Sequence, residues 1–412
     1  KPTAVITHGH NKDFRPDLKQ LLWILTVSAD GAVPIACRVA DGNTEDSGTH
    51  IPTWDELVAL VGNTHFLYVA DCKLATRANM DHIDGHGGRF VTIMPRTRRE
   101  DTWFRDWVTR NTPTWVEASR APARRRTDPP DIMATFEAPL GSAEGHRIIW
   151  VHSTRKAVND AATRARRIER ATAALENLAA RLAGPKSRIT TRVVAEGTAR
   201  ALLDDLDATR YFDITINPTR AKDYTAEHRG NPGPGTRFRQ NTKIRFTLTW
   251  RLRHHTVRHD AASDGCFPLI TNDTTMTPAA ILAAYKYQPN LERRNHCLKG
   301  HQAVAPVNLH SPARIEALLC CHFFALLTHA LIERQARTAM AAANLKTIPL
   351  YPEERDCPAP SGTRILQIFD SLNRQQITSD GATIQLFEPH LDALQRHVLK
   401  LLGIPASAYH AR

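Results

Sequence analysis

Apolar residues in the N-terminal part of the chain recur with two periods that together predict a mixed α/β fold. Continuous or alternating apolar, β-branched runs predict four strands, at Leu18–Ser28, Val33–Ala40, His65–Ala70 and Arg89–Met94. Apolar residues three and four positions apart predict one helix capped by Thr49 or Thr53 and a second helix over about Leu74–Gly85. This ββαβαβ order is typical of a mixed sheet with helices on its faces.

A polar stretch rich in proline follows Pro95, includes Arg124–Arg126, and predicts a linker or an excursion from the sheet. Further along, apolar periodicity predicts strands at His146–His152, Tyr211–Asn217 and Cys266–Thr271. It also predicts helices over Asn159–Ala183, from Pro278, over about Pro312–Arg337 and over Leu391–Leu402. The first of these helices carries an apolar seam of Ile168, Leu175, Leu178 and Leu182.

The segment Arg229–His259 has an unusual charge pattern. Its apolar residues, from Ile244 to Leu252, alternate with cations that include Lys243, Arg245, Arg251 and Arg253. Period-two alternation places the apolar set on one face of a strand and the cations on the other. The segment holds eight Lys and Arg and no Asp or Glu. A solvated outer face is one interpretation; because uncompensated cations repel one another, a bound phosphate backbone is the other.

Composition narrows the functional class. The 412 residues include 54 Lys and Arg against 42 Asp and Glu, a formal net charge of +12, which favours a polyanionic partner. No uninterrupted apolar run approaches the roughly 20 residues of a membrane helix. The seven cysteines form no CxxC pairs, so we expect neither a zinc site nor a disulfide framework, and a reducing cytoplasm fits better.

Two carboxylates are candidates for chemistry. Asp71 directly follows a buried strand, where an open α/β sheet places functional groups, although an Asp there is often only a turn residue. On a helix, Tyr285, Gln288, Glu292 and Lys299 would fall on one face, since each residue advances about 100°. Pro289 either kinks that helix or begins a new one with Gln288 as its cap.

Phosphodiester cleavage explains why such residues would be needed together. It requires an activated nucleophile and a stabilised leaving oxygen, and two Mg²⁺ ions about 3.5–4 Å apart, held by carboxylates from different elements, supply both. A neighbouring Lys and Tyr can position the phosphate.

Several blocks of this sequence together resemble a known family. One group of bacterial insertion-sequence transposases of the Asp-Asp-Glu type has a signature of four residues: a Tyr, an Arg after two intervening residues, a Glu after three more and a Lys after six more. This sequence matches that spacing at Tyr285, Gln288, Glu292 and Lys299, with Gln in place of Arg. Further blocks resemble one subgroup of these enzymes: Thr7–Gln20, Asp41–Asp46 (DGNTED), Phe66–Leu74 (FLYVADCKL), Gly88–Asp101, the RGNPGPGT turn and Val304–Leu319.

The resemblance implies an RNase H-like sheet with a large insertion between the second Asp and the Glu. Asp71 is similar to the second catalytic Asp and Glu292 to the catalytic Glu, which would bind two Mg²⁺ or Mn²⁺ ions. Tyr285, Gln288 and Lys299 would contact the ends of the element, together with the cations Lys243, Arg245, Arg251 and Arg253. An amide at Gln288 cannot replace the charged bidentate clamp of the family's Arg.

The first catalytic Asp of the family lies upstream of the stretch that resembles Thr7–Gln20. We therefore expect a chain truncated at its N-terminus that lacks the first, central strand between Leu18–Ser28 and His65–Ala70. The expected divisions are a first part of the catalytic core at 1–96, a basic insertion domain of mixed α/β structure at 97–263, a second core part at 264–345 and a C-terminal helical region at 346–412.

The expected function is DNA transposition: metal-dependent hydrolysis at the element ends, then attack of the 3′-hydroxyl on target DNA. The partners implied are double-stranded DNA and a second copy of the chain in a synaptic complex, with no membrane, in the bacterial cytoplasm at the nucleoid. Two alternatives stay open: a catalytically inactive fragment that only binds DNA, and a metal-dependent nuclease without strand transfer.

Overall fold

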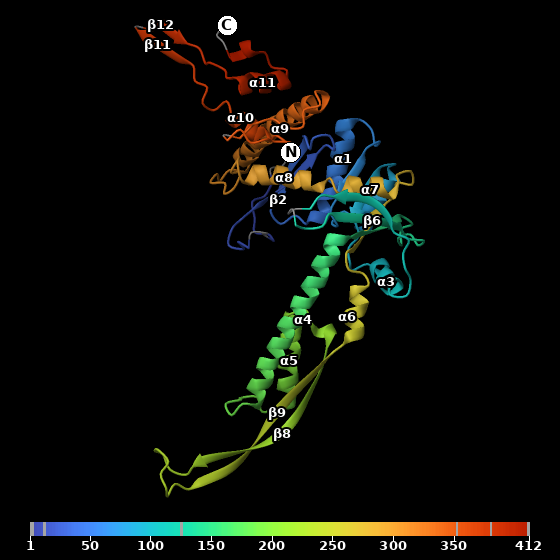
Figure 1. Cartoon of the computed structure of the whole chain (residues 1–412), viewed down its shortest axis with the longest axis vertical. Coiled ribbons are helices and arrows are strands. Elements are labelled where there is room, and N and C mark those ends of the chain that lie inside the picture. The colour runs from blue at the N-terminus through green and yellow to red at the C-terminus, as the bar shows by residue number, and fades with distance from the viewer. Residues whose placement is uncertain (1–3, 11–13, 124–126, 352, 380, 410–412) are drawn as a thin grey trace. The chain divides into compact units, whose positions relative to one another are not determined.

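The computed structural model describes residues 4–10, 14–123, 127–351, 353–379 and 381–409 (Figure 1). The chain divides into two compact units. Unit 1 combines Lys1–Val91 with Ala283–Arg412, and unit 2 is Thr92–Leu282. Both ends of the chain therefore build one unit, and its middle builds the other. The four divisions expected from the sequence remain a prediction.

The N-terminal elements follow the predicted order. They are β1 (Leu21–Val27), β2 (Pro34–Asp41), α1 (His50–Val61), β3 (Leu67–Ala70), α2 (Arg77–Gly85) and β4 (Arg89–Ile93). Trp54 of α1 packs closely over Gly88, where a Cβ atom would lie 2.6 Å from the indole ring, so only glycine fits between α2 and β4. Thr49 occupies the N-cap position of α1, as one of the two predicted alternatives had it.

Strands β3 and β4 belong to a mixed six-stranded sheet that also contains β5 (Val116–Ala121), β6 (Asp131–Glu137), β7 (Arg147–Ser153) and β10 (Cys266–Thr271). The strand order is β3-β4-β10-β7-β6-β5, and helices flank the sheet. The mixed α/β class is thus confirmed. Among the described residues, β1 pairs with β2 alone, as a separate antiparallel sheet. The two strands expected to flank a central strand therefore lie in different sheets, each with one edge that no described strand pairs.

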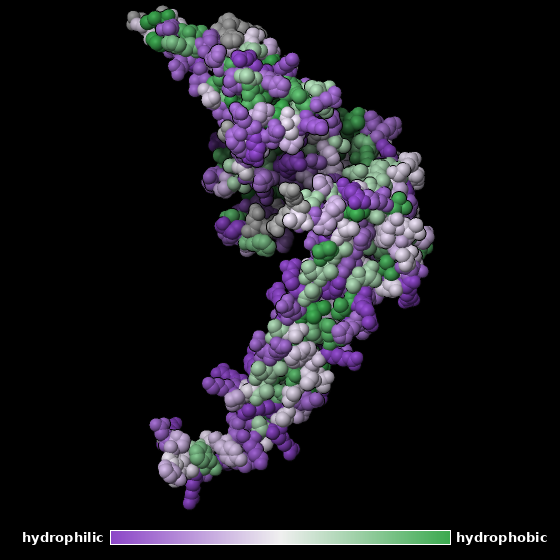
Figure 2. Space-filling view, in the orientation of Figure 1, coloured by the Kyte–Doolittle hydropathy of each residue, from purple (hydrophilic) through white to green (hydrophobic). Residues whose placement is uncertain are grey.

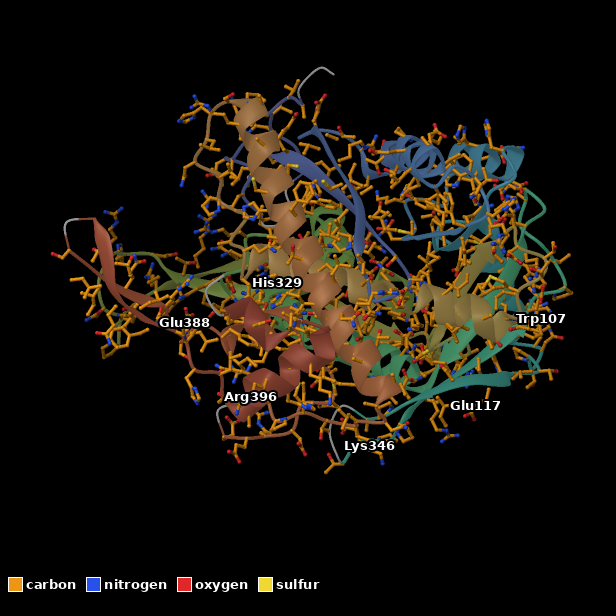
Figure 3. The ribbon with its side chains drawn as sticks, turned by 90° about the horizontal axis from the view of Figure 1, so that it is seen from above. Trp107, Glu117, His329, Lys346, Glu388 and Arg396 are labelled. Atoms are coloured by element: carbon orange, nitrogen blue, oxygen red, sulfur yellow. The ribbon has the colours of Figure 1, made fainter. Side chains whose placement is uncertain are left out.

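The stretch after Pro95 is not a linker, so that prediction is wrong. It forms α3 (Arg99–Val108), β5 (Val116–Ala121) and β6 (Asp131–Glu137), and the two strands continue the six-stranded sheet beside β7 (Arg147–Ser153). Trp107 of α3, labelled in Figure 3, stacks on Phe136 of β6 with ring centroids 5.5 Å apart. Arg124–Arg126 lies outside the described residues.

Unit 2 also contains an arm of two helices and a long strand pair. It consists of α4 (Thr154–Ala183), α5 (Arg192–Asp205), β8 (Phe212–Ala226) and β9 (Phe238–Leu252). The predicted seam of α4 is confirmed, because Leu175, Leu178 and Leu182 are buried against α5 and the strands, with Ile168 at the margin. Phe246 and Leu248 of β9 enter the same core. The far half of the β8–β9 ribbon extends past the ends of both helices (Figure 1).

Three short elements follow the arm, and helices dominate the rest of unit 1. After α6 (His254–Ala261), β10 (Cys266–Thr271) returns to the sheet and α7 (Pro278–Tyr285) follows. Unit 1 then adds α8 (Gln288–Lys299), α9 (Pro312–Ala342), α10 (Gly362–Gln367), the hairpin β11 (Gln375–Ser379) and β12 (Ala382–Phe387), and α11 (Ala393–Leu402).

Of the described helices, α9 is the one long and apolar enough, by length and composition, to cross a membrane, with a mean hydropathy of 1.9 over its most apolar window. In this structure α9 packs against α8, α10, α11 and β2 of its own unit.

Candidate functional site

Asp71 lies where the sequence expects a functional carboxylate, directly after β3. Its Oδ1 accepts a hydrogen bond of 2.9 Å from the backbone N–H of Lys73, and its carbonyl accepts one of 3.1 Å from Leu74. These bonds form a tight turn that presents the exposed side chain at the end of the strand. The carboxylate therefore both closes the turn and faces solvent.

The helix expected to carry Tyr285, Gln288, Glu292 and Lys299 is broken. Helix α7 ends at Tyr285, and α8 begins at Gln288 with Tyr287 as its N-cap and Pro289 in its first turn. The prediction of a new helix beginning at the proline is confirmed, with the cap one residue earlier than expected. Proline fits there because N–H groups in the first turn of a helix have no partner within the helix.

Tyr285 lies within electrostatic range of both predicted catalytic carboxylates. Burial, together with the negative charges of Asp71, Cys72 and Glu292, raises the pKa of Tyr285 to about 12. Charges more than about 10 Å apart are largely screened in solution. Asp71, which follows β3, and Glu292, on α8, therefore both lie within electrostatic range of one phenol in unit 1.

A second pair lies near Asp71, and sequence reasoning missed it. His50, the first residue of α1, lies with its Nδ1 3.1 Å from the hydroxyl of Tyr68 on β3. Burial lowers the pKa of His50, opposed by the nearby carboxylates of Asp71 and Asp46. Burial also raises the pKa of Tyr68, and the charge of Asp71 adds to that rise. No local spacing links these residues; only the Tyr68 position, three residues before Asp71 on a short strand, hints at a shared site.

Helix α8 is held in place by its buried face. Arg294 is 3% exposed, and its Nη1 lies 2.7 Å from Oε2 of Glu333 on α9. The same guanidinium donates to the carbonyl oxygens of Gly31 and Ala32 at 2.8 and 2.9 Å. Because these contacts join three distant segments of unit 1, they fix the rotation of α8 that leaves Glu292 exposed.

The remaining predicted residues of α8 lie at its two ends. Gln288 is the first residue and is half-buried, and Lys299 is the last residue and is exposed. Glu292 and Lys299 are seven positions apart on the helix, about two turns, and so share one face. A negative and a positive side chain thus project from the same side of α8.

The predicted cationic strand lies on β9, in unit 2, and its charges are largely compensated. Asp223 of β8 pairs with Lys243 at 2.9 Å and with Arg245 at 2.7 Å. Asp213 of β8 pairs with Arg253. The premise that these cations lack counter-charges is therefore wrong: the neighbouring strand supplies two carboxylates. For Arg251, no ion pair is recorded within the described residues.

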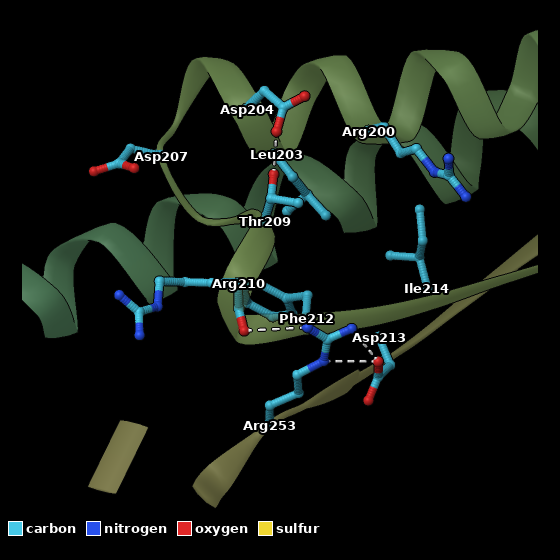
Figure 4. Close-up of a pocket in the computed structure, with 10 residues that line it drawn as sticks. All are labelled: Arg200, Leu203, Asp204, Asp207, Thr209, Arg210, Phe212, Asp213, Ile214 and Arg253. Atoms are coloured by element: carbon cyan, nitrogen blue, oxygen red, sulfur yellow. Dashed lines mark hydrogen bonds and ion pairs between the residues drawn. The ribbon is translucent and has the colours of Figure 1, made fainter. Parts of the chain in front are cut away.

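A cavity of about 650 Å³ lies at the base of the arm, lined by α5, the loop that follows it, the start of β8 and Arg253, the residue after β9 (Figure 4). Arg253 is the one predicted site residue among its lining. Its guanidinium donates to Asp213 at 2.7 Å, while Arg210 pairs with Asp260 at 2.8 Å. Since two of its three arginines are already paired, the cavity offers little uncompensated charge to a ligand.

Metal-binding potential at the Asp71 site comes from two carboxylates. Within the residues that the structure describes, no group of three or more His, Cys, Asp and Glu side chains has the arrangement of a metal site. Exposed carboxylates are the oxygen donors that Mg²⁺ prefers, and Mg²⁺ commonly takes one or two of them and completes its shell with water and phosphate oxygens. The donor set that is present therefore fits Mg²⁺.

No family model matches this chain, and no curated protein is significantly similar to it in sequence.

Proposed function

We propose that this chain is a DNA transposase of the insertion-sequence type with an RNase H-like catalytic unit. One observation carries the proposal: Asp71 and Glu292, which are far apart in the sequence, both raise the pKa of Tyr285. The spacing of Tyr285, Glu292 and Lys299, and the blocks that resemble such transposases, identify the chemistry for which this convergence is suited. The RNase H-like order of strands is part of the proposal.

In this proposal Asp71 and Glu292 hold Mg²⁺ at the end of β3. When bound, Mg²⁺ supplies Lewis-acid stabilisation of phosphoryl oxygens. The turn bond from Lys73 fixes the direction of the Asp71 carboxylate. The Arg294–Glu333 pair fixes the rotation of α8 and so the position of Glu292.

Tyr285 and Lys299 position the DNA backbone. Because the pKa of Tyr285 is raised to about 12, its hydroxyl keeps its proton at neutral pH and donates it in a hydrogen bond to a phosphate oxygen. Lys299 adds a point charge on the same side of α8 as Glu292, which attracts the backbone two turns further along.

The test uses protein expressed from the complete gene and a supercoiled plasmid that carries the DNA flanking that gene on both sides. Asp71→Asn and Glu292→Gln are expected to abolish Mg²⁺-dependent cleavage while leaving DNA affinity within about twofold, since each removes a carboxylate and no phosphate-binding cation. Asp81→Asn is the matched control, because it neutralises an exposed carboxylate of α2 in the same unit.

Undiminished cleavage by either site variant would refute the assignment. Products in which an element end is joined to target DNA identify strand transfer. Cleavage without joined products would instead identify a nuclease, and binding without cleavage by the unaltered protein would identify a DNA-binding protein.

A further inference from the structure

The far half of the β8–β9 ribbon has two faces that differ in chemistry. Residues directly opposite one another in an antiparallel pair share a face. The register pairs Arg220 with Ile244, Lys222 with Thr242 and Tyr224 with Gln240, and Ala226 with Phe238 continues the row. We call this the aromatic face; its large side chains are Arg220, Lys222, Tyr224, Phe238, Gln240 and Ile244.

The opposite face, which we call the paired face, carries its own counter-charge. It holds Lys243 and Arg245, and Asp223, which lies opposite Asn241, forms an ion pair with each. Arg239 shares this face further out, opposite Thr225. The sequence pattern predicts this face as the phosphate-binding one, but the Asp223 carboxylate already compensates the charges of Lys243 and Arg245.

The aromatic face is exposed and contains no acidic residue. Tyr224 is 61% exposed, Phe238 is 49% exposed and Ile244 is 56% exposed. Arg220 and Lys222 are also exposed, and no ion pair is recorded for either within the described part of the chain. Figure 2 shows a small hydrophobic patch among hydrophilic residues at the end of the ribbon. Aromatic and apolar side chains beside uncompensated cations indicate a binding surface, because large apolar groups are seldom clustered on a free surface.

Charge and shape identify the partner. Thr219–Arg245, the far part of the ribbon with its turn, contains seven Lys and Arg and two acidic residues. Neighbouring strands lie about 4.8 Å apart, so a two-stranded ribbon with its side chains fits the major groove of B-form DNA, which is about 12 Å wide. The major groove of A-form RNA is too narrow for it.

We propose that the aromatic face of the β8–β9 ribbon binds double-stranded DNA in its major groove. The inference rests on the proposed function for its choice of DNA as the polyanion. Arg220 and Lys222 contact the phosphates that border the groove, and Tyr224, Phe238 and Ile244 contact the apolar edges of the bases. Gln240, whose Oε1 accepts a hydrogen bond of 3.3 Å from the Tyr224 hydroxyl, presents its amide to base edges.

The experiment measures fluorescence anisotropy of a short labelled duplex in EDTA, where no metal-dependent cleavage takes place. The variant Arg220→Ala with Lys222→Ala removes two phosphate contacts. At about 0.15 M salt, counterion release makes each contact worth roughly fivefold, so affinity is expected to fall on the order of 30-fold and the salt slope by about 1.8.

The matched control removes two cations from the paired face of the same ribbon, by Arg239→Ala with Lys243→Ala. Because Asp223 already compensates Lys243, we expect a loss of at most about fivefold. Equal losses from the two double variants, or a greater loss from the control, would overturn the proposal. The charge-conserving variant Arg220→Lys with Lys222→Arg is expected to bind like the unaltered protein, which separates loss of charge from misfolding.

Two further measurements address the groove. Tyr224→Ala with Phe238→Ala is expected to weaken binding by about tenfold without changing the salt slope, because it removes no charge. A duplex RNA of the same sequence is expected to compete about tenfold less well than DNA. Unchanged affinity of the aromatic variant, or equal competition by RNA, would refute binding in the groove.

These outcomes are independent of catalysis. If the unaltered protein cleaves no DNA but the aromatic-face variants lose affinity as expected, the proposed function fails and the ribbon inference stands. If Asp71→Asn abolishes cleavage but the aromatic-face variants bind DNA normally, the proposed function stands and the ribbon inference fails.

Discussion

Arg294 and Glu333 form an ion pair of 2.7 Å in which the two residues are only 3% and 5% exposed. Glu333 also accepts a hydrogen bond of 3.0 Å from the backbone N–H of Gly362, so the pair joins α8, α9 and the start of α10. A buried pair of this kind is costly to break because the remaining charge stays buried without its partner.

The first prediction concerns this pair. Arg294→Met and Glu333→Gln are each expected to lower the free energy of unfolding by about 3–5 kcal/mol, because each leaves a buried polar group without its partner. The double variant Arg294→Met with Glu333→Gln is expected to lose less than the sum of the two single losses. Urea denaturation measures all three. Strictly additive losses would show that the two side chains do not interact in solution.

The second prediction concerns the ionisation of Tyr285. Its pKa of about 12 lies above the value of about 10 for a free phenol, so the folded state holds the proton more tightly than the unfolded state. The stability that this contributes is present below about pH 10 and is lost as the pH rises from about 10 to 12. In Tyr285→Phe, the part of the decrease in unfolding free energy between about pH 10 and 12 that comes from this phenol is expected to disappear. Urea denaturation at several pH values across this range measures it.

The same phenol tests whether the two carboxylates converge. Asp71→Asn and Glu292→Gln are each expected to lower the pKa of Tyr285, because each removes a negative charge that opposes the phenolate. Ultraviolet difference titration against Tyr285→Phe isolates this one phenol. Asp81→Asn is expected to leave it unchanged. A pKa that responds to neither site variant would place the carboxylates too far apart to act together.

The third prediction concerns Gly265, in the turn before β10. Its φ of +81° is unfavourable for residues with a side chain, and a Cβ atom would lie 2.6 Å from the carbonyl oxygen of Ser153. Gly265→Ala is therefore expected to destabilise unit 2 by about 1–3 kcal/mol. Gly197→Ala is the control, because Gly197 lies within α5 with open space at its Cβ position, and it is expected to stabilise by about 0.5–1 kcal/mol. Thermal unfolding distinguishes the opposite signs.

The fourth prediction concerns the core of the arm. Phe246 is buried between β9 and the helices, so Phe246→Ala is expected to cost about 3–5 kcal/mol. Ile244→Ala, two residues away on the same face but beyond the core, where its side chain is 56% exposed, is expected to change stability by less than about 0.5 kcal/mol. Hydrogen exchange of the α4 and α5 amides reports both. Equal protection in the two variants would contradict the burial pattern of β9.

The sequence predicts those elements whose buried side chains are apolar. The seam of α4 and the strands β3, β4 and β10 are of this kind, and each was located within a few residues. Strand β6 was missed because its buried positions are Asp131, Met133 and Thr135, which give no hydrophobic alternation. Strand β5 was missed because it lies at the edge of the sheet and is mostly exposed.

Some residues of the candidate site can likewise be predicted from the sequence, and others cannot. Residue type and spacing along one segment identify Glu292 and Lys299, and position after a strand identifies Asp71. The ion pairs that Asp213 and Asp223 make with β9 depend on the strand register, which no single segment contains. The contact of His50 with Tyr68 likewise depends on how α1 packs against β3, so it has no local signature.

Unit 1 draws on both ends of the chain, and this affects how the protein is made. During synthesis, Asp71 leaves the ribosome long before Glu292. The carbonyl groups of Gly31 and Ala32 likewise have no Arg294 to accept hydrogen bonds from until all of unit 2 has been translated. The helix that orients Glu292 gains its partner Glu333 later still. A chain that stops before α8 therefore contains the complete arm but lacks Glu292, so the carboxylate pair of the proposed site can form only after all of unit 2 has been synthesised.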